Sequence, residues 1–162
     1  MRCRLPELVA AWLTLDQLHV ESVPMWAAGW LVQGYDGPAL AELAGLSARD
    51  PREVRDLLPD ALAEAGVPPL TATYAAVKVT LDDIAQLHLT GRARWSWVVD
   101  QVDQLARESH DVLDQPLGRL YTINDQPGEP WSPTETELAQ TVHNACLDQT
   151  GQRDEAGQLD QA

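Results

Sequence analysis

Apolar residues recur every three or four positions through most of this chain, and proline or glycine bounds many of the periodic segments. This spacing places the apolar side chains on one face of an α-helix. Residues 50–66 show the pattern together with its ends. Asp50 and Glu53 can form a capping box, Pro51 suits the first helical position, and Gly66 ends the helix. The sequence therefore predicts an all-α fold.

We expect five to seven packed helices in a single domain over residues 1–150, because 162 residues suffice to bury one core. The polar residues 151–162 are expected to form a disordered tail. Ser22 is a candidate cap for a helix with Pro24 in its first turn. The other predicted helices cover approximately 5–13, 38–44, 50–66, 95–108 and 132–149.

Three segments are harder to interpret. Residues 71–79 have some strand character, although Val77 and Leu81 fit a helical period better. Pro59 lies inside a helical pattern and removes one backbone donor, so a kink or break is expected there. Residues 115–131 are rich in proline and glycine and are expected to be irregular.

The net charge excludes some partners. The chain has 25 acidic and 11 basic residues, giving a formal net charge of −14. Affinity for nucleic acid comes mainly from Lys and Arg that neutralise phosphates, so neither nucleic acid nor an anionic membrane is expected to bind. A basic protein would be attracted to such a surface. The alternative interpretation is that the acidity serves solubility alone.

The expected compartment is the cytoplasm. Cys3 and Cys146 are two distant thiols and do not form a disulfide framework. The N-terminus has basic residues and a short apolar run, but no small-residue cleavage site follows it. No apolar run approaches the length that spans a bilayer, so no membrane association is predicted.

No motif of catalysis or metal binding occurs in the sequence. The four histidines have no spacing typical of a zinc or iron site; they are His19, His88, His110 and His143. No nucleophile elbow and no glycine-rich phosphate loop is present. We therefore predict no catalytic residues, no metal and no cofactor. An enzyme whose site is assembled from distant carboxylates and histidines stays open as an alternative.

Two groups of residues are candidates for contact with a partner. Asp56, Asp60 and Glu64 are spaced four residues apart and would form an acidic stripe on one helix face. Such a stripe can equally be a solvated surface. Trp95 and Trp97 flank Ser96, so a helix would bury one and expose at least part of the other. An exposed Trp close to Arg92 and Arg94 could anchor a partner, or have no role.

Residues 39–58 resemble the helix-turn-helix of bacterial repressors, with Ala41, Gly45 and Val54 at its small, turn and second-helix apolar positions. In that family the second helix reads bases with its N-terminal residues. Here the turn is about three residues longer than the motif requires. The second helix also begins with Asp50 and Glu53, and the only positive residues near its start are Arg49, Arg52 and Arg55. A hairpin used for packing explains this pattern better.

Residues 26–65 also resemble small helical proteins of high-GC bacteria, and residues 72–110 do so more loosely. The matching pieces are Trp30 and residues 36–40, 43–46 and 50–58. That family has no established activity, so the resemblance implies a helical fold and no active site.

The sequence as a whole favours a small, non-enzymatic interaction protein. A more specific hypothesis is an inhibitor of the immunity or antitoxin type that covers a basic partner such as a nuclease toxin. A helix-turn-helix transcription regulator that uses residues 39–58 is the main alternative. No sequence signal indicates an oligomeric state.

Overall fold

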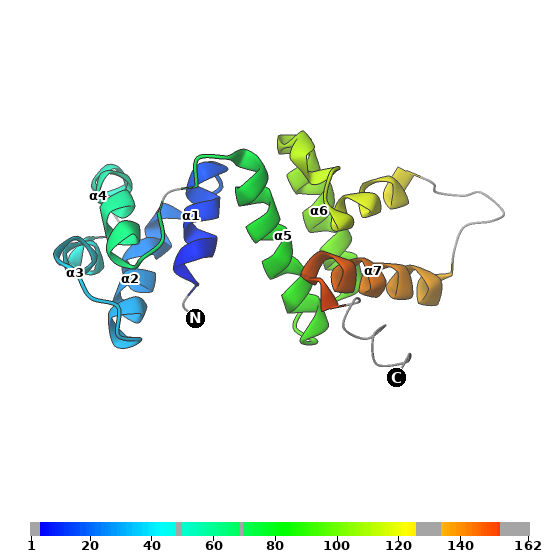
Figure 1. The fold of residues 1–162 in the computed structure, drawn as a ribbon, viewed down its shortest axis with the longest axis horizontal. Helices are drawn as coiled ribbons and strands as arrows, with labels where there is room; N and C mark the ends of the chain where they lie inside the picture. Colours follow the sequence, from blue (N-terminus) through cyan, green and yellow to red (C-terminus); the bar gives the residue numbers. More distant parts are fainter. Residues whose placement is uncertain (1–3, 48–49, 69, 126–133, 153–162) are drawn as a thin grey trace. The chain divides into compact units, whose positions relative to one another are not determined.

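The computed structural model describes residues 4–47, 50–68, 70–125 and 134–152. In this part of the chain all regular elements are helices and no strand occurs, which confirms the all-α prediction (Figure 1). The α-helices are α1 Pro6–Thr14, α2 Val23–Val32, α3 Pro38–Gly45, α4 Pro51–Glu64, α5 Thr73–Leu89, α6 Trp95–Glu108 and α7 Glu135–Thr150. The 3-10 helices are η1 Val20–Ser22, η2 His110–Val112 and η3 Pro116–Asp125.

The chain divides into two compact units, Met1–Ala76 and Val77–Ala162. We call them the N-terminal unit and the C-terminal unit. The first contains α1 to α4, and the second contains most of α5 together with α6, α7, η2 and η3. The expectation of a single domain over 1–150 stays a prediction. Most of the expected disordered tail, residues 153–162, lies outside the described residues.

The core of the N-terminal unit includes two buried tryptophans, Trp26 and Trp30, and Trp12 packs against it. Trp30 on α2 is fully buried, and its indole Nε1–H donates to the backbone oxygen of Arg4 at 2.6 Å. The rings of Trp12 and Trp26 lie 5.8 Å apart, and the Arg4 guanidinium lies 5.3 Å from the centroid of the Trp12 ring. Burial of the indole rings and of the aliphatic side chains around them stabilises this core. The cation–π contact between Arg4 and Trp12 adds to it.

A carboxylate from α4 caps the start of α3. Glu64 accepts hydrogen bonds from the backbone amides of Ala39 and Leu40, at 3.1 and 2.8 Å. These amides have no partner within α3, and the helix dipole favours a negative charge beside them. A Cβ on Gly37 would lie 2.2 Å from Glu64 Oε2, so the residue before Pro38 must be glycine for the carboxylate to approach.

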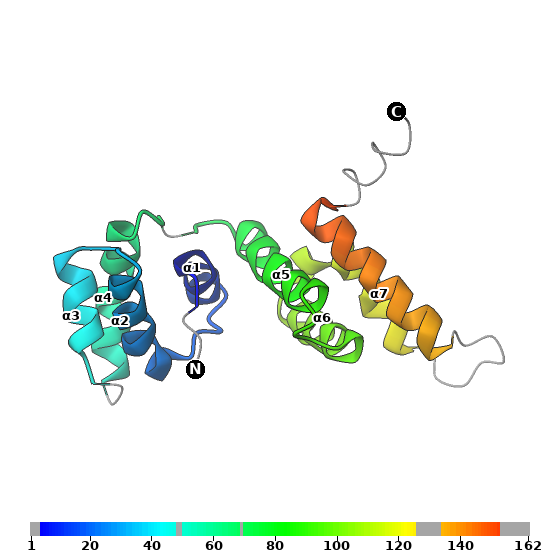
Figure 2. The ribbon, with the colours of Figure 1, turned by 90° about the horizontal axis from the view of Figure 1, so that it is seen from below.

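The C-terminal unit packs η3 against both α6 and α7, and α6 also contacts α7 (Figure 2). Its apolar core includes Val98, Val102, Leu117, Leu120 and Val142, each of which is at most 1% exposed. Leu120 thus belongs to this core. The surrounding residues 116–125 form the long 3-10 helix η3, so the prediction of an irregular segment is wrong for this part.

A polar network is buried within the C-terminal unit. The Gln149 side-chain amide donates to Asp82 Oδ1 at 2.7 Å and to Gln115 Oε1 at 3.3 Å. Its oxygen accepts from the backbone amide of Leu117 at 3.3 Å. Gln149 thus joins α5, α7 and η3. Gln115 Nε2 is buried and has no hydrogen-bond partner in the described part of the chain.

The possible strand near 71–79 is not formed, because α5 begins at Thr73. Val77 and Leu81 lie one helical turn apart and are fully buried, while Val79 between them is half-buried. Burial thus follows the helical period rather than alternation. The helix α4 also continues through Pro59, so no break occurs there.

Two predicted caps differ from the structure. Asp50 and Ser22 occupy N-cap positions, but neither side chain accepts a capping hydrogen bond. The capping box expected for Asp50 and Glu53 is therefore wrong. The last helix has a capping box at Thr134 and Glu137 instead. It begins at Glu135, and residues 132–133, where the sequence placed its start, lie outside the described residues.

Candidate functional site

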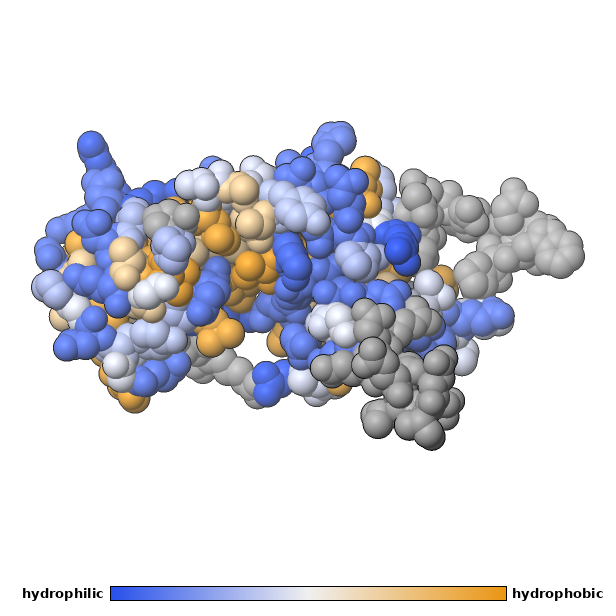
Figure 3. All heavy atoms as spheres, viewed as in Figure 1, coloured by the Kyte–Doolittle hydropathy of each residue, from blue (hydrophilic) through white to orange (hydrophobic). Residues whose placement is uncertain are grey.

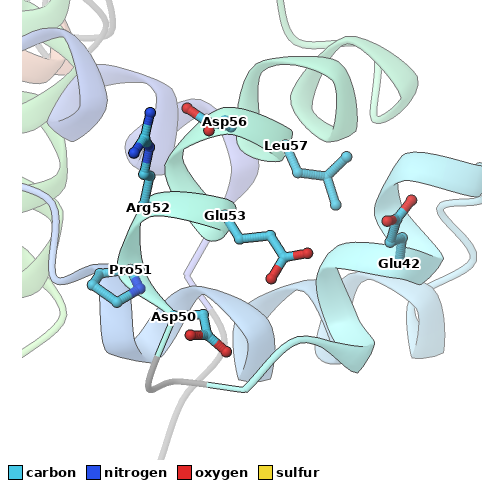
Figure 4. A pocket seen from close by; sticks show the side chains of 7 residues that line it. All are labelled: Glu42, Asp50, Pro51, Arg52, Glu53, Asp56 and Leu57. Carbon is cyan, nitrogen blue, oxygen red and sulfur yellow. The ribbon is translucent and has the colours of Figure 1, made fainter.

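A pocket of about 470 Å³ opens where α3 and the first half of α4 come together (Figure 4). Its lining residues are Glu42, Asp50, Pro51, Arg52, Glu53, Asp56 and Leu57, and we call it the acidic pocket. Four carboxylates and one guanidinium make the lining strongly negative. Asp50, which does not cap its helix, contributes its side chain to this lining.

The helical period of α4 distributes these side chains. Glu53 and Leu57 are one turn apart and extend toward the side on which Glu42 extends from α3 (Figure 4). Arg52 and Asp56, also one turn apart, extend from the other side of α4. A carboxylate pair with an aliphatic neighbour suits a cationic side chain that has an apolar stem, as Arg and Lys have.

The predicted acidic stripe is exposed on α4, but its three members have different surroundings. Asp56 lines the acidic pocket, and Asp60 is exposed outside it. Glu64 caps α3 through the amides of Ala39 and Leu40. A charge removed at Glu64 would therefore change the stability of the N-terminal unit as well as its surface.

The predicted aromatic pair belongs to α6 in the C-terminal unit. Trp97 is 37% exposed and Trp95 is half-buried, so both are partly exposed, whereas helical spacing predicted that one of them would be buried. The acidic stripe belongs to the N-terminal unit. The structure therefore does not bring the two groups of candidate residues together within one unit.

Sequence reasoning missed three of the four carboxylates of the acidic pocket. Asp50 and Glu53 were interpreted as capping residues of α4, which explained their charge without a surface role. Glu42 lies eight residues before Asp50 and belongs to no sequence motif that would indicate a binding site. The exposed sides of α3 and α4 could have indicated the pocket only if the packing of these two helices had been known.

No group of three or more His, Cys, Asp or Glu side chains able to hold a metal ion occurs among the described residues. The rings of His88 and His143 lie 5.7 Å apart, and His88 Nδ1 lies 3.0 Å from the backbone oxygen of Ala93. Burial raises the pKa of the Cys146 thiol to about 12. No described helix is both long and apolar enough to cross a bilayer.

The helices α3 and α4 occupy the region that resembles a helix-turn-helix. Residues 46–50 separate them, and residues 48–49 of this connection lie outside the described chain. No family model, no curated protein and no solved structure matches the chain. The two resemblances thus rest on the sequence motifs alone.

Proposed function

We propose that this protein is a non-enzymatic interaction protein that binds a basic protein partner through the acidic pocket. The observation that carries the proposal is a pocket whose lining includes four carboxylates, one from α3 and three from the start of α4 and its N-cap: Glu42, Asp50, Glu53 and Asp56. The net charge of −14 adds a field that attracts a positively charged partner over a longer range.

The energetics of the pocket favour fast rather than tight association. Exposed ion pairs are worth about 0.2–1 kcal/mol each, so several pairs at the pocket give a modest total. Charge complementarity mainly accelerates the encounter. Leu57 in the lining offers apolar contact beside these charges.

An inhibitor of the immunity or antitoxin type is the specific form that we favour. Such a protein works by covering a partner, and needs no reacting groups of its own. A toxin that acts on nucleic acid has a basic surface because its substrate is a polyanion. An acidic pocket would compete directly for that surface.

The regulator alternative depends on the arginines near the start of α4. Arg52 lines the acidic pocket among four carboxylates, and Arg55 pairs with Asp16 at 3.2 Å. Phosphates approaching this end of α4 would meet mostly negative charge. The regulator is therefore the weaker candidate, and a duplex-DNA shift assay at physiological salt distinguishes it.

The test begins with capture of a partner from host cells, followed by association kinetics with the purified partner. The triple variant E42Q/E53Q/D56N removes three charges from the acidic pocket. The variant D100N/D114N/E135Q removes the same charge from exposed positions in the C-terminal unit, and is its matched control. Both variants leave Glu64 intact.

We expect a captured protein with a basic surface, and an association rate that falls about tenfold or more in the pocket variant at low salt. The control variant should lower the rate by much less. Equal effects of the two variants would mean that net charge alone acts, and would contradict the proposed site. Salt-dependent, sub-micromolar binding of duplex DNA would favour the regulator instead.

A further inference from the structure

A pair of histidines joins two helices of the C-terminal unit. His88 lies in the last turn of α5 and His143 lies on α7, and the centroids of their rings are 5.7 Å apart at an interplanar angle of 66°. The same two helices are joined by the hydrogen bond from Gln149 to Asp82. The pair is therefore part of the contact between α5 and α7, and no spacing in the sequence could indicate it.

The tautomer of His88 is set by the backbone. Its Nδ1 lies 3.0 Å from the carbonyl oxygen of Ala93, in the connection between α5 and α6. Since a carbonyl oxygen can only accept, Nδ1 carries the hydrogen, and the neutral ring keeps its lone pair on Nε2. The Ala93 amide donates to the backbone oxygen of Leu87 at 3.0 Å, which helps to hold this acceptor in place. Histidines that bind metals are typically anchored in this way, through the nitrogen that does not bind the ion.

His143 supplies a second nitrogen that an ion can reach. The residue is exposed, and in the described part of the chain its ring makes no hydrogen bond or ion pair. A neutral imidazole keeps a lone pair on one nitrogen, and rotation about the side-chain torsions can turn this nitrogen toward His88. The pair thus offers one anchored ligand and one adjustable ligand.

We propose that His88 and His143 form a two-histidine site for a divalent transition-metal ion such as Zn²⁺, bound through Nε2 of His88 and one ring nitrogen of His143. Imidazole is a ligand that suits ions of this kind. Two imidazoles bound tetrahedrally to one zinc ion at about 2.0–2.1 Å have ring centroids roughly 5 Å apart. The observed separation of 5.7 Å is close to this value, so a small rotation of the exposed ring brings both nitrogens to the ion. Water completes the coordination.

The surroundings also suit a cation. The net charge of −14 raises the concentration of cations near the protein. Hydrophilic side chains predominate among the coloured atoms on the face of the C-terminal unit drawn in Figure 3, which is compatible with the approach of hydrated ions. Carboxylates such as those of the acidic pocket suit Mg²⁺ and Ca²⁺ better than zinc, so the two places select different ions.

Binding at the histidine pair should stabilise the C-terminal unit. The folded chain holds the two rings together, whereas the unfolded chain does not, so the ion shifts the unfolding equilibrium by mass action. Two protein ligands are fewer than the three or four of tight zinc sites, so the affinity is moderate and the stabilisation depends on the zinc concentration. This inference is independent of the partner proposed for the acidic pocket.

The experiment is a titration of the full chain with Zn²⁺, followed by the ¹⁵N shifts of the histidine rings. A Cys3→Ser background is used, because a thiol near the N-terminus is itself a zinc ligand. We expect saturable binding of one ion per chain, with the largest shifts at His88 and His143, and a melting temperature that rises with zinc concentration. Zinc that binds without shifting these two rings would overturn the proposal, as would the lack of saturable binding up to about 1 mM.

Variants separate the ligand role from packing. His143→Ala should raise the zinc dissociation constant about tenfold or more, whereas His110→Ala, at another exposed histidine of the same unit, should leave it unchanged. His88→Asn keeps an amide donor near the position of Nδ1 for the Ala93 carbonyl but lacks Nε2. It should therefore lose zinc binding while its melting temperature without zinc stays close to that of the parent chain.

The acidic pocket provides a further control. E42Q/E53Q/D56N removes three carboxylates and no histidine, so it should bind zinc nearly as tightly as the parent chain. If this variant loses zinc binding and His143→Ala does not, the ion binds at the carboxylates and the proposal is wrong.

Discussion

The two units of this protein bury different kinds of side chain. The N-terminal unit has a hydrophobic cluster that includes Trp26 and Trp30. In the described residues the buried polar side chains are Thr80, Gln115 and Gln149, and all three belong to the C-terminal unit. The first unit is thus held mainly by apolar burial, whereas the second also depends on satisfied hydrogen bonds.

The units also differ in how they use their acidic residues. In the C-terminal unit, Asp82 pairs with Lys78 at 2.6 Å and Asp103 pairs with Arg107 at 2.5 Å, each within a single helix. In the N-terminal unit, carboxylates from α3 and α4 gather around one pocket. An ion pair between side chains one turn apart stabilises its own helix. A group of like charges around a pocket instead attracts a cation from outside the protein.

The largest expected effect on stability is in the tryptophan core. Trp30→Ala should lower the free energy of unfolding by about 3–5 kcal/mol, because it leaves a cavity and removes the bond to the Arg4 carbonyl. Trp97→Ala, at a residue 37% exposed, is the control and should cost much less. Urea denaturation measures both, and equal losses would contradict the assignment of the core.

The polar network of the C-terminal unit gives the next effect. Gln149→Leu should cost about 1–3 kcal/mol, because it leaves the Leu117 amide and Gln115 without their buried partner. Gln115→Met should cost less, since it also removes the unsatisfied Nε2 group. If Gln115→Met proves the more damaging in denaturation, the network is not organised around Gln149.

A smaller effect is expected where α4 caps α3. Glu64→Ala should destabilise the protein by about 0.5–2 kcal/mol, in the range of a lost helix cap. Asp60→Ala, one turn earlier on α4, should change stability by less than about 0.5 kcal/mol. Thermal melting compares the pair, and a larger shift for Asp60 would show that the stripe acts as a structural unit.

The smallest effect concerns pH and the start of α7. Hydrogen bonds from the Thr134 backbone amide and then its hydroxyl hold the pKa of Glu137 below the ordinary 4.5. A lowered native pKa means that this contribution to stability is complete above about pH 4.5 and is lost as the pH falls through the native value. The protection of the amides at 135–138 against exchange, corrected for intrinsic rates, should therefore fall in acid. Glu137→Gln should remove that pH dependence, whereas Thr134→Ala should reduce it only in part, because the backbone amide at 134 can still donate.

Local features of the fold could be predicted, because they depend on neighbours in the sequence. Pro38, Pro51 and Gly66 indicated helix ends, and apolar periods identified the buried faces. The contacts that define the site join distant residues. Glu64 caps amides 24 and 25 residues earlier, and Gln149 bonds to Asp82 across 67 residues. Only the packing of the helices brings such pairs together.

The candidate site shows the same limit. Helical spacing predicted the exposure of Asp56 and of at least one of Trp95 and Trp97, since exposure follows from the period of one helix. The spacing of residues in one helix could not show that Glu42 on α3 and Glu53 on α4 would line the same pocket. The same spacing predicted one surface role for Asp60 and Glu64, although only Glu64 accepts hydrogen bonds from backbone amides of a neighbouring helix.

The most direct measurement of the central claim is a map of the partner contact on the full-length, ¹⁵N-labelled protein. The basic protein recovered by capture is added while the backbone amide shifts are followed. The account predicts that the largest changes fall on Glu42 and on residues 50–57 around the acidic pocket, and that high salt reverses them. Changes centred on Trp97 in α6, or binding that leaves residues 50–57 unperturbed, would contradict it.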